Sequence, residues 1–261
     1  ERVLAKLGLK PGSISTQIAH PESLAYFLHA HVMLSGALGQ FARDCRHLMR
    51  TEIGEVREAF DAGQVGSSTM AQKRNPINFE NIEGMWLRTR KEYLGVFDTL
   101  ISDHQRDLVG SSLMRDFPTI VVNVHVQLGT LLRRKDKDGP TFLERLNVDP
   151  AACQKNLVLQ GSLILAEPLY LALQMCGYTG DGHKLVNEVL VPVAQNQAIT
   201  LIAALEQSSD DDAKLAWAKV PEDVRRGFES VANYTGSAAH QARTLADVAE
   251  DYLLHSGFPS E

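Results

Sequence analysis

A loop between two helical segments combines residue types that can bind a carboxylate and move a proton. Residues 66–76 read Gly-Ser-Ser-Thr-Met-Ala-Gln-Lys-Arg-Asn-Pro, so Ser67 and Ser68 precede Lys73 and Asn75. Lys73 offers a positive charge and Asn75 an amide donor, and together they suit a carboxylate. A serine whose hydroxyl is made more acidic by its surroundings can accept a substrate proton. By composition alone, a flexible polar loop without chemistry is equally compatible with these residues.

A second segment, residues 104–115, contains residue types that suit a phosphate. Ser111 and Arg115 are four residues apart and share one face if the segment is helical. Gly110 suits a helix start, where free amide groups favour an anion, and Arg106 can approach the same anion. Two guanidinium groups and a hydroxyl make a good phosphate cradle, although a pair of surface arginines is the plainer alternative.

Order and spacing in the loop narrow its interpretation. The loop resembles the GSSxMPxKxNP segment of the fumarase/aspartase superfamily, whose members use its serine as general base. The resemblance implies that Ser67 is the base, with Ser68 beside it. It also implies that Lys73 and Asn75 hold the carboxylates of the substrate, and it places Met70 among the substrate contacts.

The loop departs from the family pattern at one position. Ala71 stands where the family has proline. Without the proline the unfolded loop has more conformational freedom, which costs about 0.5–1 kcal/mol of stability. We therefore expect the loop to be mobile when no ligand is bound.

The second segment points to one branch of that superfamily. Arg-Asp-Leu-x-x-Ser-x-x-x-Arg resembles the nucleotide-binding segment of adenylosuccinate lyases, and Arg106, Ser111 and Arg115 fall on its matching positions. The residues before the first long helix resemble a TQI segment of the same family, which implies that Gln17 contacts substrate. Without that resemblance, helix capping by Ser15 or Thr16 is the simpler interpretation. His104 adjoins the phosphate segment and is a further candidate contact.

Long helices must position these residues. Apolar residues recur at helical spacing along three segments, which indicates an all-α bundle and no convincing sheet. We expect all of the stripe residues to lie in the core, and the histidines within the stripes to be packed or at the surface. The stripes are Leu24, Phe27, Leu28, Leu34, Leu38, Phe41, Cys45 and Leu48; Trp86, Tyr93, Phe97, Leu100 and Ile101; and Ile120, Val121, Val124, Leu128, Leu131 and Leu132.

Breaker residues suggest where the chain divides. A charged stretch at residues 133–140 reads as a solvated turn, and Asn-Val-Asp-Pro at 147–150 as a boundary. We expect a truncated long-helix bundle of the fumarase/aspartase type at residues 1–148. A small helical C-terminal domain follows at residues 149–261, where short segments also resemble adenylosuccinate lyases.

Composition excludes several classes of protein. The 261 residues carry a net charge of −6, which argues against a general nucleic-acid binder. Three widely spaced cysteines, with no CxxC pattern, indicate reduced thiols in a cytoplasmic protein. No apolar run has membrane length, and no HExxH spacing or acidic cluster suggests a metal. We expect no metal and no organic cofactor.

The resemblance implies an activity and its limits. The family eliminates fumarate from adenylosuccinate, giving AMP, and from the succinyl-carboxamide ribotide of purine synthesis. Its members are homotetramers whose sites are shared between subunits. The histidine that acts as acid comes from a region not found in this sequence, so we expect the chain alone to be inactive or incomplete. The alternatives are a 3-carboxymuconate cycloisomerase-like enzyme and a helical assembly module without a complete site.

Overall fold

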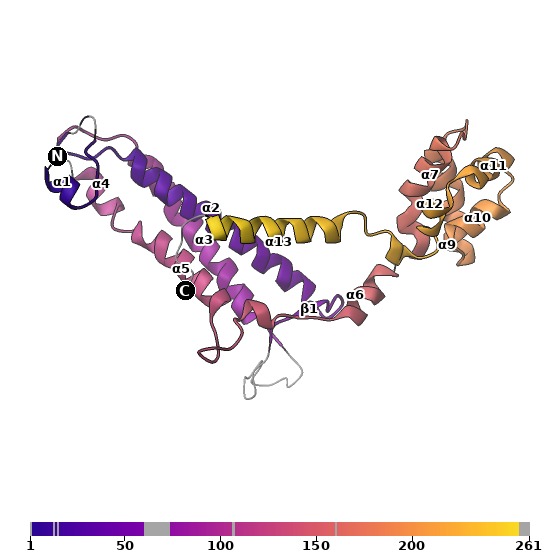
Figure 1. The fold of residues 1–261 in the computed structure, drawn as a ribbon, viewed down its shortest axis with the longest axis horizontal. Helices are drawn as coiled ribbons and strands as arrows, with labels where there is room; N and C mark the ends of the chain where they lie inside the picture. The colour runs from indigo at the N-terminus through magenta and orange to yellow at the C-terminus, as the bar shows by residue number, and fades with distance from the viewer. Residues whose placement is uncertain are drawn as a thin grey trace. The chain divides into compact units, whose positions relative to one another are not determined.

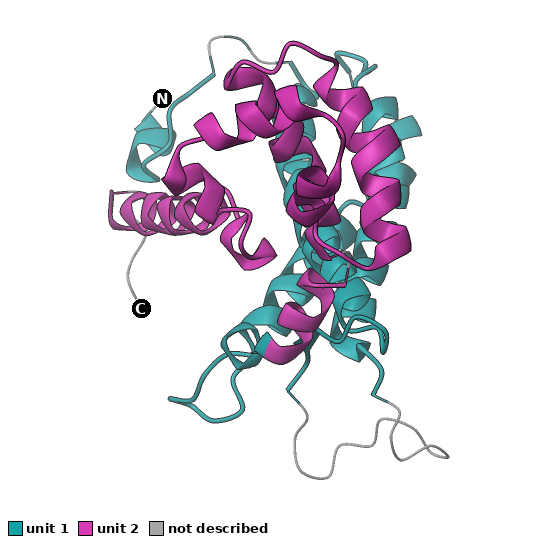
Figure 2. Ribbon diagram, turned by 90° about the vertical axis from the view of Figure 1, so that its right-hand side faces the viewer, with its two compact units in different colours: residues 1–150 teal, residues 151–261 magenta. Residues whose placement is uncertain are grey.

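The computed structural model describes residues 2–12, 14, 16–59, 74–105, 108–159 and 161–255. These residues form two compact units, Glu1–Pro150 and Ala151–Glu261, shown in different colours in Figure 2. Almost all of the regular structure is helical, and the predicted all-α class is confirmed. The sequence places the domain boundary after residue 148, and the division by contacts falls at Pro150.

Unit 1 is built on three long helices, α2 (Glu22–Leu48), α3 (Ile77–Asp98) and α5 (Pro118–Leu132), which pack on one another (Figure 1). Short helices α1 (Arg2–Lys6), α4 (Val109–Leu113) and η1 (Leu143–Arg145) lie at its ends. Two short strands, β1 (Val56–Arg57) and β2 (Asn147–Val148), pair antiparallel, with Val56 opposite Val148.

Close approach of α2 to α3 depends on a glycine. A Cβ atom added at Gly39 would lie 2.9 Å from Cβ of Trp86, closer than side chains tolerate. Glycine removes that conflict, so the indole of Trp86 lies directly against the backbone of α2. The same face of α2 buries small residues, Ser35 and Ala42 among them.

The core of unit 1 is divided by polar residues. One apolar cluster, with Phe79 and Phe142, lies toward the β1–β2 end, and a second, with Leu28 and Ile120, lies toward the other end. Along the sequence of each long helix, buried polar residues lie between the residues of the first cluster and those of the second. Four of these polar residues are at most 2% exposed: Ser35, Thr89, Asn123 and Gln127. Gln127 donates from Nε2 to the carbonyl oxygens of Ser35 and Ile82.

The expectation that every stripe residue is core is wrong. Leu28, Cys45 and Ile120 are buried, but Phe27, Phe97 and Leu132 are each more than half exposed, and Ile101 is 92% exposed. Helix α3 ends at Asp98, so Leu100 and Ile101 lie beyond it. In a three-helix bundle each helix contacts its neighbours along one narrow strip, and small residues fill much of that strip here. The apolar surface of the helices is therefore wider than the face they bury.

Most of unit 2 is a cluster of short helices around one continuous apolar core, which includes Leu169, Leu173, Val186, Leu201 and Leu205. The last helix, of 18 residues, has no buried residue. Side-chain caps begin several of the helices: Asp181 accepts from the amide of Lys184, Thr200 from that of Ala203, and Asp210 from that of Ala213. The elements are α6 (Pro150–Leu157), η2 (Gly161–Leu165), α7 (Ala166–Met175), α8 (Gly182–Lys184), the π-helix η3 (Leu185–Leu190), α9 (Val191–Gln197), α10 (Leu201–Gln207), α11 (Asp211–Lys219), α12 (Glu222–Arg226), η4 (Val231–Asn233) and α13 (Ala238–His255).

Among the described residues, no single helix has the length and apolar composition needed to cross a membrane, and two sharply bent helix pairs reach that composition only jointly. Cys45, Cys153 and Cys176 are free thiols.

Candidate functional site

Two of the predicted site residues lie together at one end of the bundle. Gln17, in the segment before α2, and Ser111, in α4, line one hollow of about 430 Å³, which we call the end hollow. Gln17 is exposed and Ser111 half-buried, so both residues can be reached from solvent. The remaining lining comes from the segment before α2, from the end of α3 and the residues after it, and from α4 and its flanking residues: Ile18, Asp98, Thr99, Ile101, Ser102, Leu108, Val109, Gly110, Leu113 and Met114.

Packing against α3 fixes α4 at the end hollow. A Cβ atom added at Gly95 would lie 2.8 Å from Cδ1 of Leu113, so glycine allows Leu113 to sit against α3. Phe117, just before α5, is 4% exposed and joins the apolar cluster at this end. Ser111 is thereby held at the rim of a packed core.

The structure corrects the predicted geometry of the phosphate segment. Helix α4 has five residues and ends at Leu113, so Arg115 lies past its C-cap and does not share a helical face with Ser111. The amide of Arg115 donates to the carbonyl of Ser112, as in a tight turn. So short a helix carries little macrodipole, and an anion at the end hollow must rely mainly on side chains. Arg115 is exposed, and Arg106 lies outside the described residues.

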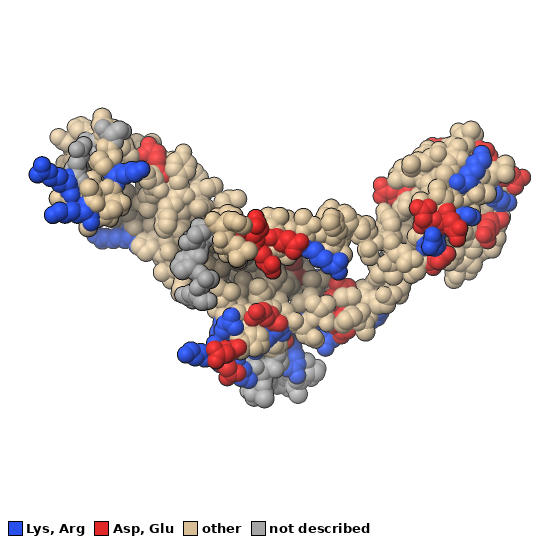
Figure 3. Space-filling view, viewed as in Figure 1, with Lys and Arg blue, Asp and Glu red and all other residues tan. Residues whose placement is uncertain are grey.

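Charge at this end of the bundle is mixed. On the face drawn in Figure 3, Lys and Arg side chains gather over the end of unit 1 that carries α1 and α4. Asp98 also lines the end hollow, and its negative charge opposes binding of an anion close to it.

His104 lies in a smaller neighbouring hollow of about 180 Å³, whose lining shares Ile18 and Ser102 with the end hollow. Thr16 also lines it, and its hydroxyl donates to the carbonyl of Ile18 rather than capping α2. Of the histidines in the helical stripes, His29 shares a hydrogen bond with the Tyr93 hydroxyl and is exposed. His20 lines the same smaller hollow, so two histidines, His20 and His104, lie beside the predicted ligand residues, and the sequence analysis singled out only His104.

Asn75 lies at the opposite end of unit 1. It is half-buried and immediately precedes Pro76 and α3. The other loop residues singled out from the sequence, Ser67, Ser68, Met70 and Lys73, lie outside the described residues, as does the expected mobility of the loop.

The length of α3 separates the two groups of predicted residues. Asn75 precedes the first turn of this 22-residue helix, whereas Asp98 and Thr99 at its other end line the end hollow. At about 1.5 Å per residue, the two ends lie about 33 Å apart. Unit 1 therefore brings Gln17 and Ser111 together but keeps Asn75 far from both.

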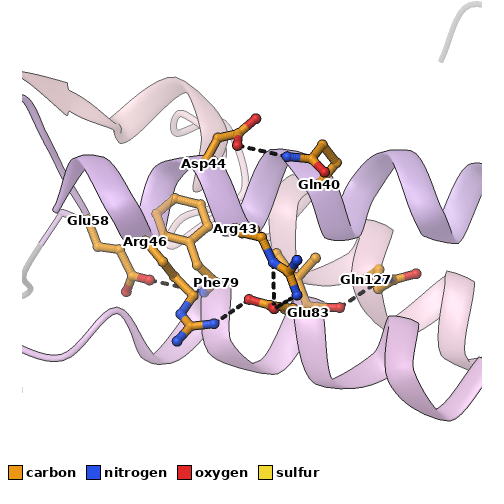
Figure 4. Close-up of polar contacts among 9 residues, drawn as sticks. Gln40, Arg43, Asp44, Arg46, Glu58, Phe79, Glu83 and Gln127 are labelled. Carbon is orange, nitrogen blue, oxygen red and sulfur yellow. Dashed lines mark hydrogen bonds and ion pairs between the residues drawn. The ribbon is translucent and has the colours of Figure 1, made fainter. Parts of the chain in front are cut away.

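Buried carboxylates occupy the Asn75 end, and the sequence analysis missed them. Glu83 accepts from Arg43 and Arg46 of α2 (Figure 4). Burial raises the pKa of Glu83, but the hydrogen bonds and charges of the two arginines outweigh it, and the net pKa lies below its usual value. Glu58 is 5% exposed and accepts from the start of α3, and burial raises its pKa despite these hydrogen bonds. Single glutamates near helix ends carry no sequence pattern that marks them as buried.

Among the described residues, no group of three or more His, Cys, Asp or Glu side chains is gathered as a metal site would require.

Known lyases are similar to this chain in sequence and in structure. The family model described as "Lyase" matches residues 1–90. Adenylosuccinate lyase from Pyrococcus abyssi is 37% identical over 253 residues, 95% of this chain and 52% of that protein. The counterpart from Archaeoglobus fulgidus is 30% identical over 97% of this chain and 54% of that protein. The chain thus spans about half the length of these curated relatives.

Solved structures share the fold. The 3-carboxy-cis,cis-muconate lactonizing enzyme from Pseudomonas putida matches 90% of this chain and 50% of its own, with a TM-score of 0.69 and 26% identity. A fumarate lyase from Mesorhizobium sp. BNC1 matches 90% of this chain and 49% of its own, with a TM-score of 0.68 and 22% identity.

Proposed function

This chain belongs to the adenylosuccinate lyase family of the fumarase/aspartase superfamily, and on that premise we propose that it forms part of an enzyme that releases fumarate from adenylosuccinate. The same elimination acts on the succinyl-carboxamide ribotide of purine synthesis. The observation that carries the proposal is that Gln17 and Ser111, far apart in the sequence, line one hollow.

The roles of the residues follow from the chemistry of elimination. Ser67, with Ser68 beside it, removes a proton from the carbon next to a substrate carboxylate, while Lys73, Asn75 and Met70 hold the dicarboxylate. The carbon–nitrogen bond then breaks, its electron pair stays on nitrogen, and an acid protonates that nitrogen. The products are AMP and fumarate, and the balance requires no metal or organic cofactor.

The phosphate of the nucleotide binds at the other end of the bundle. Ser111 and Gln17 donate hydrogen bonds in the end hollow, and Arg106 and Arg115 supply charge around it. Asp98 confines the anion to the side of the hollow away from its carboxylate.

A distance of about 33 Å between Asn75 and the end hollow supports a site shared between chains. A substrate the size of a nucleotide cannot reach both ends of α3. Two copies packed side by side in opposite directions bring the Asn75 end of one unit 1 against the end hollow of the other. Exposed apolar residues on all three long helices, such as Tyr26, Leu94 and Val126, suit such packing. We propose a homotetramer on these grounds.

The first experiment measures turnover and assigns the base. The chain is mixed with adenylosuccinate, with and without a recombinant N-terminal portion of the Pyrococcus abyssi relative, and the loss of absorbance is followed. We expect turnover only with the added portion. Ser67→Ala should then lower kcat about 10²–10⁴-fold and leave substrate binding intact, while Ser68→Ala retains most of the activity. Full turnover by the Ser67 variant would assign the base elsewhere.

The second experiment tests the nucleotide. AMP binding is measured by calorimetry on the chain, on Ser111→Ala and on Ser112→Ala, whose side chain is exposed and does not line the end hollow. We expect Ser111→Ala to bind AMP more weakly than the unchanged chain, and Ser112→Ala to bind it equally well. If AMP fails to bind the assembled enzyme, the nucleotide assignment is wrong.

A cycloisomerase-like activity is the second candidate, and the Pseudomonas putida structure favours it through 26% identity over 90% of this chain. Its substrate carries no phosphate. Turnover of 3-carboxymuconate without AMP binding would select this candidate. Absence of both activities in the mixture would leave a helical assembly module.

A further inference from the structure

A buried carboxylate ties the segment that enters the predicted substrate loop to the helix that follows the loop. Oε1 of Glu58 accepts from the backbone amides of Asn78 and Phe79, both at 3.1 Å, and Oε2 accepts from Nδ2 of Asn78 at 2.7 Å. Figure 4 shows Glu58 pointing toward the start of α3 beside Phe79. The side chain crosses between two parts of the chain that the sequence separates by twenty residues.

Glu58 acts as the N-terminal cap of α3. The residue at the N-cap position is Pro76, which makes no side-chain cap hydrogen bond. The first amides of a helix lack partners within it, and a carboxylate at this end also interacts favourably with the helix dipole. Glu58 thus supplies from outside the helix what the local sequence lacks.

Neighbouring contacts hold both partners of this bond in place. Strand β1 ends one residue before Glu58 and pairs with β2, and Arg57 lies 3.6 Å from a carboxylate oxygen of Asp149. On the other side, Nη2 of Arg133 donates to Oδ1 of Asn78 at 3.1 Å. Glu58 and Asn78 are therefore each anchored to the bundle independently of the loop.

The first turn of α3 in turn sets the backbone of Asn75. The carbonyl oxygen of Asn75 accepts from the amide of Ile77 at 2.9 Å, and that of Pro76 accepts from Glu80 at 2.8 Å. Asn75 is half-buried, so its side chain has limited freedom once this turn is fixed. A shift of the α3 start moves Asn75, and errors of about 1 Å in a binding group are costly to catalysis.

We propose that Glu58 is a positioning residue: through the first turn of α3 it holds Asn75 where a substrate carboxylate can reach it. The inference rests on the proposed function for the role of Asn75, and on the geometry above for the contact itself. Glu58 does not touch substrate. A cap that only stabilised the fold would leave catalysis unchanged once the protein is folded.

The experiment compares Glu58→Gln and Glu58→Ala with Glu52→Gln. The glutamine variant keeps one carbonyl acceptor, whereas alanine removes both, and Glu52 is exposed and undergoes the same chemical change as a control. Hydrogen–deuterium exchange is read on peptides covering residues 74–80. Turnover of adenylosuccinate is read in the mixture with the N-terminal portion, and AMP binding on the same samples.

We expect exchange of the Asn78 and Phe79 amides to be at least tenfold faster in the alanine variant. We expect kcat/KM for adenylosuccinate to fall about 10–100-fold, with glutamine between alanine and wild type. AMP affinity should stay within about twofold, because the end hollow lies at the other end of α3. The Glu52 variant should match wild type throughout.

The other outcomes decide against the inference or against the proposed function on which it rests. Unchanged exchange in the alanine variant would show that Glu58 does not hold the turn. Faster exchange with wild-type kcat/KM would make Glu58 a cap without influence on Asn75. If the wild-type mixture shows no turnover, the proposed function fails; exchange at residues 74–80 then still decides whether Glu58 holds this segment.

Discussion

The cores of the two units differ in how many polar residues they bury. All buried polar and charged residues found among the described residues lie in unit 1, Ser35, Glu58, Glu83 and Gln127 among them. The core of unit 2 is a single apolar cluster whose polar groups remain at its edge, as the Tyr178–Asp210 hydrogen bond does. Every predicted site residue belongs to unit 1. Polar groups inside a core cost stability unless they are paired, so the unit that contains the predicted site residues also has the less uniform core.

The largest expected effect is on the apolar core of unit 2. Leu173→Ala removes a side chain of 0% exposure and should lower the free energy of unfolding by about 2–5 kcal/mol. Leu171→Ala, on the same helix but 45% exposed, should change it by less than about 0.5 kcal/mol. Urea denaturation measures both. Equal losses would mean that unit 2 lacks the close-packed core described above.

The second largest effect on stability is expected for Glu83 and its partners Arg43 and Arg46 in unit 1. Glu83→Gln weakens charged hydrogen bonds to Arg43 and Arg46 and should lower stability by about 1.5–3 kcal/mol at neutral pH. Because the pKa of Glu83 is lowered on folding, its contribution is present above the ordinary carboxyl pKa and is lost as pH falls through the folded value.

Urea denaturation at neutral pH and near the folded-state pKa of Glu83 measures this effect. The difference between variant and wild type should shrink on acidification. Glu92→Gln, on the same helix, serves as control, and a difference that persists in acid would exclude the charge as its source.

A smaller effect is expected at the edge of the unit 2 core. The Tyr178 hydroxyl donates to Oδ2 of Asp210 at 2.7 Å, and burial together with this carboxylate raises the pKa of Tyr178 to about 12. Tyr178→Phe should cost about 0.5–1.5 kcal/mol at neutral pH. Since the folded pKa is raised, this contribution is full below the ordinary tyrosine pKa and is lost as pH rises toward about 12.

Ultraviolet titration of the phenol and unfolding of the variant measure these two quantities. Tyr252→Phe, on α13 and 67% exposed, is the matched control. A titration of Tyr178 at the ordinary tyrosine pKa would contradict the part-buried hydrogen bond to Asp210.

The smallest expected effect is a gain in unit 1. Thr89 is 0% exposed, and its hydroxyl has no partner among the described residues. Thr89→Val keeps the shape and removes an unsatisfied group, so stability should rise by up to about 1 kcal/mol. Thr99→Val, on the cap of the same helix, removes a bond of 2.7 Å to the Val96 carbonyl and should lower it by a similar amount. Thermal unfolding measures the stability of both variants. A loss of stability in both would mean that the hydroxyl of Thr89 has a hydrogen-bond partner.

Much of the fold could be predicted from residue patterns, but not which face of each helix is buried. Helical spacing predicted all three long helices. It assigned Phe27 and Leu34 to the core, because periodicity cannot tell a face that meets its own chain from one left open. Small residues such as Ser35 and Gly39 mark the buried strip of α2, and a hydrophobicity pattern gives them no weight.

Some features of the candidate site could likewise be predicted from the sequence, and others could not. Gln17 and Ser111 were predicted from a resemblance, and the fold brings them together. The end of α4 before Arg115 was not predicted, because a spacing of four residues says nothing about where a helix stops. Glu58 was missed because two of its three donors are backbone amides, which every sequence has, and the third is the side chain of Asn78, twenty residues away.

The length of α3 has a genetic consequence. A chain substituted at Asn75 retains an unaltered end hollow, and a chain substituted at Ser111 retains an unaltered Asn75 end. If sites combine opposite ends of different chains, two inactive alleles of these two kinds can restore activity when expressed together, whereas two alleles altered at the same end cannot.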